Sequence, residues 1–146
     1  MGIRVLCCSY ENVVSYTCGY SHWNTLKNQI VESTQHYIQS CSQSDEVFYS
    51  DLQNIKKELV DNHDVILFLK IASKYMKLLE HLNLEGIYTF IYSSDSDHEF
   101  TYENSMAIEK SIQIVSPYIS LYKSDIIDML AVFHESGVTR NPVIIQ

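Results

Sequence analysis

Glycine and proline are scarce in this sequence, with 4 and 2 residues among 146. This scarcity argues against a flexible linker and against a loop-rich β-sandwich. No apolar run approaches the roughly 20 residues that a membrane-spanning helix needs, and the N-terminus carries no recognisable secretory signal. The sequence also contains no glycine-rich nucleotide loop and no nucleophile elbow. We therefore expect a chain that has no membrane partner and no cofactor.

Cysteine is present, but not in a pattern typical of disulfide cross-links or of a zinc site. The four cysteines, at positions 7, 8, 18 and 41, form no CxxC pair and no His-spaced set. Cys7 and Cys8 are adjacent, so on a strand their side chains point to opposite faces and do not bond to each other. This usage predicts buried free thiols and a cytoplasmic, reducing location.

Positive charge is the other shortage. The chain has 10 Lys and Arg against 18 Asp and Glu, a formal charge of −8. An acidic protein is poorly suited to nucleic acid, whose phosphates it would have to neutralise, but it suits a basic protein partner. With 46% hydrophobic residues over 146 positions, residues 1–146 can bury one core as a single domain.

Local patterns predict an α+β domain, with a small sheet of about three to four strands covered by about five helices. β-branched and apolar residues predict either a hairpin or two sequential strands at residues 3–9 and 12–17, the clearest strand at 87–92, a short return strand at 99–102 and a final strand at 142–145. Gly86 is expected to end the preceding helix, before the strand at residues 87–92. These strands would gather into one sheet, whose order the sequence does not give.

Helical spacing of apolar residues accounts for the rest of the chain. Ser21 is expected to cap a helix that ends near Ser40, and Ser50-x-x-Gln53 forms a capping box. Residues 64–82 carry the broadest apolar stripe and predict one central helix. Further helices are expected at 104–115 and from Ser124 to the stop at Gly137.

The strongest functional signal is a run of acids interleaved with aromatics. Between residues 88 and 109 the chain has five carboxylates and no Lys or Arg. Exposed acids beside rigid aromatic rings are typical of a surface that holds a basic partner. We expect the acids to lie at the surface, because unpaired buried charge is prohibitive. The predicted partner-binding residues are Tyr92, Asp95, Asp97, Glu99, Tyr102 and Glu103.

A metal site in this run is the weaker interpretation. A calcium loop that starts at Asp95 would need Gly and Glu at its sixth and twelfth positions, where Phe100 and Met106 stand. A divalent ion held by Asp95, Asp97 and His98 is the remaining variant, but a solvated acidic loop is far more common. No pair of carboxylates is singled out for catalysis, so we predict no metal and no catalytic residue.

In overall form the chain resembles the small acidic immunity proteins of bacterial toxin systems, including the contact-dependent growth inhibition type. The run from Tyr88 to Glu103 and the compact plan that ends at Val143–Ile145 carry this resemblance of class. It implies a non-enzymatic protein that sits on a basic toxin domain, often a nuclease, and blocks it. Immunity proteins share no signature, so no residue role is transferred by position.

Two other classes stay open at this stage. The composition, rich in Ile, Tyr, Asp and Ser, is similar to that of small helical host-modulating viral proteins of the Bcl-2-like kind, which offer a hydrophobic groove to a helix. The predicted strands argue against an all-helical bundle. The third class is an enzyme whose site is assembled from dispersed residues, such as a Cys–His dyad formed by Cys18 or Cys41.

Overall fold

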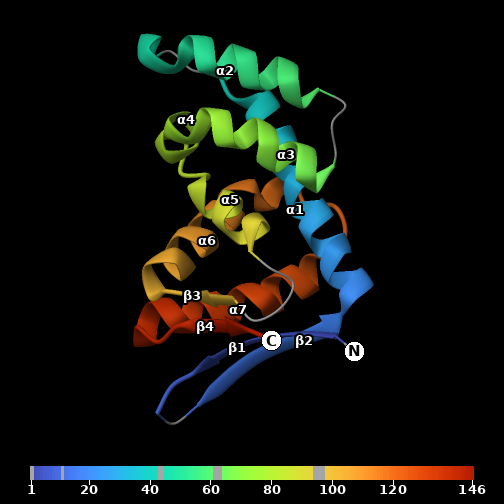
Figure 1. The fold of residues 1–146 in the computed structure, drawn as a ribbon, viewed down its shortest axis with the longest axis vertical. Helices are drawn as coiled ribbons and strands as arrows, with labels where there is room; N and C mark the ends of the chain where they lie inside the picture. Colours follow the sequence, from blue (N-terminus) through green and yellow to red (C-terminus); the bar gives the residue numbers. More distant parts are fainter. Residues whose placement is uncertain (1, 11, 43–44, 61–63, 94–97) are drawn as a thin grey trace.

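The sheet joins the two ends of the described chain (Figure 1). The computed structural model describes residues 2–10, 12–42, 45–60, 64–93 and 98–146. The predicted hairpin is confirmed as β1 (Gly2–Cys8) and β2 (Val13–Gly19). The strand β4 (Val143–Ile145) pairs with β1, and β3 (His98–Phe100) pairs with β4, all antiparallel, in the order β2-β1-β4-β3. The α+β class and the small sheet are thus confirmed, and this fold is not an all-helical bundle.

One face of the sheet supplies part of the core. Along β1, Ile3, Val5 and Cys7 are fully buried, whereas Arg4 and Cys8 on the opposite face are exposed, following the two-residue period of a strand. Leu6, also on that opposite face, is the exception, since it is buried too. Figure 1 shows the helices on one side of the sheet, with α7 (Lys123–Thr139) lying nearest to it. The predicted opposite orientation of Cys7 and Cys8 is confirmed. The expectation of buried thiols holds for Cys7 but not for Cys8.

The long helix α1 (Tyr20–Ser40) runs beside the other helices, from the sheet to α2 (Figure 1). It begins one residue before Ser21, after Gly19, and no side chain caps it. The helix α2 (Glu46–Leu59) also begins earlier than the predicted capping box. Asp45 caps it, because its Oδ1 accepts a hydrogen bond from the backbone N–H of Val47 at 3.0 Å.

The predicted central helix over residues 64–82 is divided. Asp64 caps α3 (Val65–Ala72), the 3₁₀ turn η1 (Ser73–Tyr75) follows, and α4 (Met76–His81) completes the stretch. Tyr75 departs from helical geometry, with φ −125° and ψ 31°. Phe68 on α3 and Leu79 on α4 are nevertheless both buried, so the apolar residues of both helices face the core.

The predicted strand at residues 87–92 is wrong, because these residues form the helix α5 (Glu85–Tyr92). The run is β-branched and aromatic, which favours a strand locally, but Ile87, Phe90 and Ile91 also stand at helical spacing and all three are buried. Contrary to the prediction, Gly86 does not end a helix. It lies inside α5, buried against the backbone of α6 (Tyr102–Val115).

The last helices correct two predicted boundaries. After α6 comes the 3₁₀ turn η2 (Ser116–Tyr118), and α7 begins at Lys123 behind Tyr122, which has a left-handed φ of 61°. Gly137 is not the stop, since α7 continues to Thr139 and Arg140 closes it with φ 63°.

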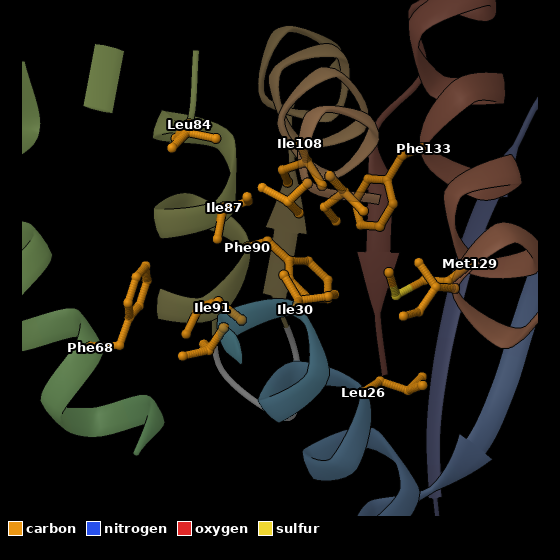
Figure 2. Close-up of a cluster of buried hydrophobic side chains, with 14 of the residues drawn as sticks. Leu26, Ile30, Phe68, Leu84, Ile87, Phe90, Ile91, Ile108, Met129 and Phe133 are labelled. Atoms are coloured by element: carbon orange, nitrogen blue, oxygen red, sulfur yellow. The ribbon is translucent and has the colours of Figure 1, made fainter. Parts of the chain in front are cut away.

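Phe90 lies at the centre of the core, where α5 meets α1 and α7 (Figure 2). Its ring lies edge to face with Trp23, centroids 5.5 Å apart, and with Phe133 at 5.9 Å. Phe133 in turn contacts Phe100 of β3 at 5.6 Å. Such edge-to-face pairs add to the burial of their area. This chain of rings couples the helices to the sheet and fixes the position of the strand that carries Glu99.

Candidate functional site

The predicted partner-binding residues lie on three different elements. Tyr92 is the last residue of α5, Glu99 is the middle residue of β3, and Tyr102 and Glu103 begin α6. Asp95 and Asp97 lie outside the described residues. Within the described residues, no hydrogen bond or ion pair joins Tyr92 or Glu99 to Glu103. Among the described members of the predicted set, Tyr102 and Glu103 are the pair that interact directly.

Tyr92 points to solvent, with 69% of its surface exposed. Its ring stacks on that of Tyr88, with centroids 5.8 Å apart and planes 15° from parallel. The two tyrosines stand four residues apart on α5, so they share one side of the helix while Phe90 and Ile91 fill the other. The helical period, and not the alternation of a strand, decides that this ring faces outward.

Glu99 is exposed at the edge of the sheet. It lies opposite Ile144 of β4, and the next residue, Phe100, is buried on the opposite face. Among the described strands β3 has only one neighbour, so Glu99 sits on an edge strand. A charge on a short edge strand discourages pairing with stray strands and at the same time presents a carboxylate to a partner.

Tyr102 and Glu103 form a small cluster with Arg140, a basic residue that lies outside the acidic run of residues 88–109. Thr101 caps α6, since the backbone N–H of Asn104 donates to its Oγ1 at 3.2 Å. The guanidinium carbon of Arg140 lies 6.0 Å from the centre of the Tyr102 ring. A hydrogen bond from the backbone N–H of Glu103 itself, then one from Tyr102, and finally the charge of Arg140 hold the pKa of Glu103 below its usual range. Arg140 reaches this site from the end of α7, so no local pattern could have revealed it.

A second polar cluster surrounds Asp125 in the first turn of α7. The hydroxyl of Tyr16 donates to Asp125 Oδ1 at 3.2 Å, and His22 Nε2 lies 3.4 Å from Oδ2. The ring of Tyr122 meets that of His22 edge to face at 5.1 Å. Burial, more than any other cause, raises the pKa of Tyr16. Sequence reasoning missed this cluster, because its members come from β2, α1 and α7.

The surroundings of the Asp125 cluster do not favour a reactive thiol. Cys18 lies beside Tyr16, but burial raises the pKa of its thiol, whereas a nucleophilic cysteine needs a lowered pKa. The thiol of Cys41 donates to the carbonyl oxygen of Tyr37 at 3.3 Å, and burial raises its pKa too. We interpret the Asp125 cluster as a structural contact that holds the hairpin, α1 and α7 together. Searched over its described residues, the chain offers no group of three or more His, Cys, Asp or Glu side chains that could hold a metal ion.

The third feature is a hollow of about 830 Å³ beside α7. It is mostly apolar, and α7 contributes more of its lining than any other element. The hollow is lined by Val14, Glu109, Gln113, Ser116, Pro117, Ile119, Lys123, Ile126, Ile127, Leu130, Ala131, His134 and Glu135. At one end His134 Nδ1 lies 3.0 Å from Glu109 Oε2. No sequence motif marks this surface, because its apolar residues read as part of an ordinary amphipathic helix.

Comparison with known proteins adds no relative. The chain matches no protein-family model, no curated protein and no solved structure. In the described part of the chain, no helix combines the length and the apolar character that crossing a membrane requires.

Proposed function

We propose that this chain is a cytoplasmic, non-enzymatic binding protein of the immunity type, which neutralises a basic toxin domain. The exposure of Tyr92 and Glu99 is the observation that carries the proposal. A ring and a carboxylate from two elements on either side of residues 94–97 both face solvent. Glu103 adds a third exposed group at the start of α6.

The charge balance of this part of the chain supports the same proposal. Residues 85–146 contain nine Asp and Glu against three Lys and Arg, so they carry most of the net charge of −8. Arg140 compensates part of it near Glu103. A surface of one sign accelerates the approach of a partner of opposite sign, and aromatic anchors slow its departure. The proposed contact residues are Tyr92, Asp95, Asp97, Glu99, Tyr102 and Glu103.

The test separates the roles of charge and ring by binding kinetics. A partner is captured on the immobilised chain and purified, and association is then measured at about 20 mM and about 200 mM NaCl, where screening differs strongly. We expect Glu99→Gln with Glu103→Gln to slow association several-fold at low salt, with the difference shrinking at high salt. Tyr92→Ala should mainly accelerate dissociation. Glu80→Gln removes another exposed acid, from α4, and is the matched control.

Neutralisation is tested on the same partner. Its toxicity on expression in cells, and its enzymatic activity if it has one, should fall when the wild-type chain is supplied and recover with the triple variant Glu99→Gln, Glu103→Gln, Tyr92→Ala. Circular dichroism checks that the variant is folded. An acidic partner, or an affinity that none of the three substitutions changes, would exclude this surface as the interface.

A further inference from the structure

One row of side chains on α7 is complementary to itself. Lys123, Ile127, Ala131 and Glu135 follow one another at intervals of four residues, so they form a single ridge along the helix. Ile127 is 65% exposed, Lys123 and Ala131 are also exposed, and Glu135 is half-buried. All four line the hollow described above. An apolar centre with opposite charges at its two ends is thus open to a partner.

The spacing of the row has a centre of symmetry at position 129. Lys123 and Glu135 lie six residues on either side of it, and Ile127 and Ala131 lie two residues on either side. A second α7 that crosses the first one antiparallel at this point places its Glu135 opposite Lys123 and its Ala131 opposite Ile127. Large side chain then meets small side chain, and each cation meets an anion. Rows spaced by four residues are also those that interdigitate in the commonest class of helix packing.

The end charges are free to make these contacts. Among the described residues, neither the ammonium group of Lys123 nor the carboxylate of Glu135 forms a hydrogen bond or an ion pair. They stand about 18 Å apart along the helix at 1.5 Å per residue, too far to pair with each other. Val14 of β2 and Pro117 of η2 extend the apolar surface on the flanks of the row.

We propose that this face of α7 binds the same face of a second copy of the chain, forming a two-fold symmetric homodimer. In such an isologous interface every contact occurs twice. Ile127 of each copy enters the hollow beside α7 of the other, next to Ala131. Two ion pairs between Lys123 and Glu135 flank this apolar centre and set the antiparallel direction. The proposal does not depend on a basic partner, because α5, β3 and the start of α6 are not part of this face.

Sedimentation or light scattering over a range of concentrations tests the proposal. The wild-type chain should change from 16.9 kDa to twice that mass as its concentration rises into the micromolar range. Ile127→Asp should weaken dimerisation at least 100-fold, because it buries two carboxylates at the centre. Ile66→Asp is the matched control, since Ile66 is 75% exposed on α3 and outside the hollow. It should leave the dimer unchanged.

A charge exchange tests the antiparallel register. Lys123→Glu alone and Glu135→Lys alone each create two like-charged pairs and should weaken the dimer about 10-fold or more at low salt. The double variant restores two opposite-charge pairs and should recover most of the wild-type affinity. A chain that stays monomeric at every concentration would overturn the proposal. So would a dimer that survives Ile127→Asp, or a double variant no better than either single one. Ala131→Arg, on the same ridge, gives an independent reading if Ile127→Asp fails to fold.

Discussion

Gly86 should be the least replaceable residue on α5. A Cβ atom built at this position would lie 2.1 Å from the carbonyl oxygen of Ala107 and 2.6 Å from the backbone nitrogen of Ile108. Both neighbours are backbone atoms of α6, so no side chain can rotate away. Ordinary contact needs more than 3 Å, and Gly86→Ala therefore forces α5 and α6 apart by about 1 Å. The hydrogen bond from the Gly86 backbone N–H to Ser111 Oγ, 3.1 Å long, would be stretched as well.

Opposing contributions to the free energy of unfolding set the size of the effect of Gly86→Ala. Alanine gains about 1 kcal/mol of helix propensity over glycine, whereas overpacking a tight contact costs about 1–3 kcal/mol or more and the strained hydrogen bond about 1 kcal/mol. We expect a net loss of about 2 kcal/mol, which for a chain of this size lowers Tm by about 4–8 °C. Calorimetry and urea melts measure both quantities.

Gly19→Ala is the matched control for Gly86→Ala. A Cβ at Gly19 meets nothing within 4 Å, and its φ of −72° suits any residue. The loss of glycine at the N-cap of α1 and the gain from a stiffer unfolded chain nearly offset each other, so the stability should stay within about 1 kcal/mol of the wild type. If Gly86→Ala is as stable as Gly19→Ala, the close approach of α5 and α6 is not real.

Two further predictions concern the core and the pH dependence. Phe68→Ala should destabilise the chain by about 3–5 kcal/mol, since Phe68 is 1% exposed and leaves a cavity; in urea melts the exposed neighbour Ile66→Ala should cost less than about 0.5 kcal/mol, and equal costs would contradict the packing in Figure 2. Burial raises the pKa of the thiols of Cys7, Cys18 and Cys41, so the stability that they contribute is complete below the unfolded pKa of about 8.5 and falls as the pH rises above it. The urea midpoint should accordingly be lower at pH 9.5 than at pH 7.5, and an unchanged or higher midpoint would refute this sign.

Local pattern predicted the hairpin, α6 and β4 because each is decided by short-range preferences. Alternation along β1 predicted that Cys7 and Cys8 point to opposite faces, although not which of them is buried, and Pro142 correctly marked the start of the last strand. The failure at residues 87–92 has a physical cause. Their side chains favour a strand in isolation, but burial of Ile87, Phe90 and Ile91 against the neighbouring helices outweighs a local preference of less than about 1 kcal/mol per residue.

The candidate sites show a similar division. That Glu99 and Glu103 are exposed could be predicted, since an unpaired acid in a core is prohibitively costly. That Arg140 approaches Glu103, that Asp125 joins Tyr16 to His22, and that α7 borders a hollow could not. Each of these contacts joins elements far apart in sequence, and the sequence gives no direct measure of such distances.

The position of β4 between β1 and β3 governs the order in which the protein can be completed. Arg4 and Gln146 exchange two backbone hydrogen bonds, of 3.0 and 2.9 Å, across almost the whole length of the chain. During synthesis the hairpin can close early, but its inner strand has no second partner until residues 143–145 leave the ribosome. Until then the apolar edge of β1 is open to other chains. The pairing of β1 with β4 can therefore form only after all the helices between them have been synthesised, and until then a nascent chain is exposed to misassociation along β1.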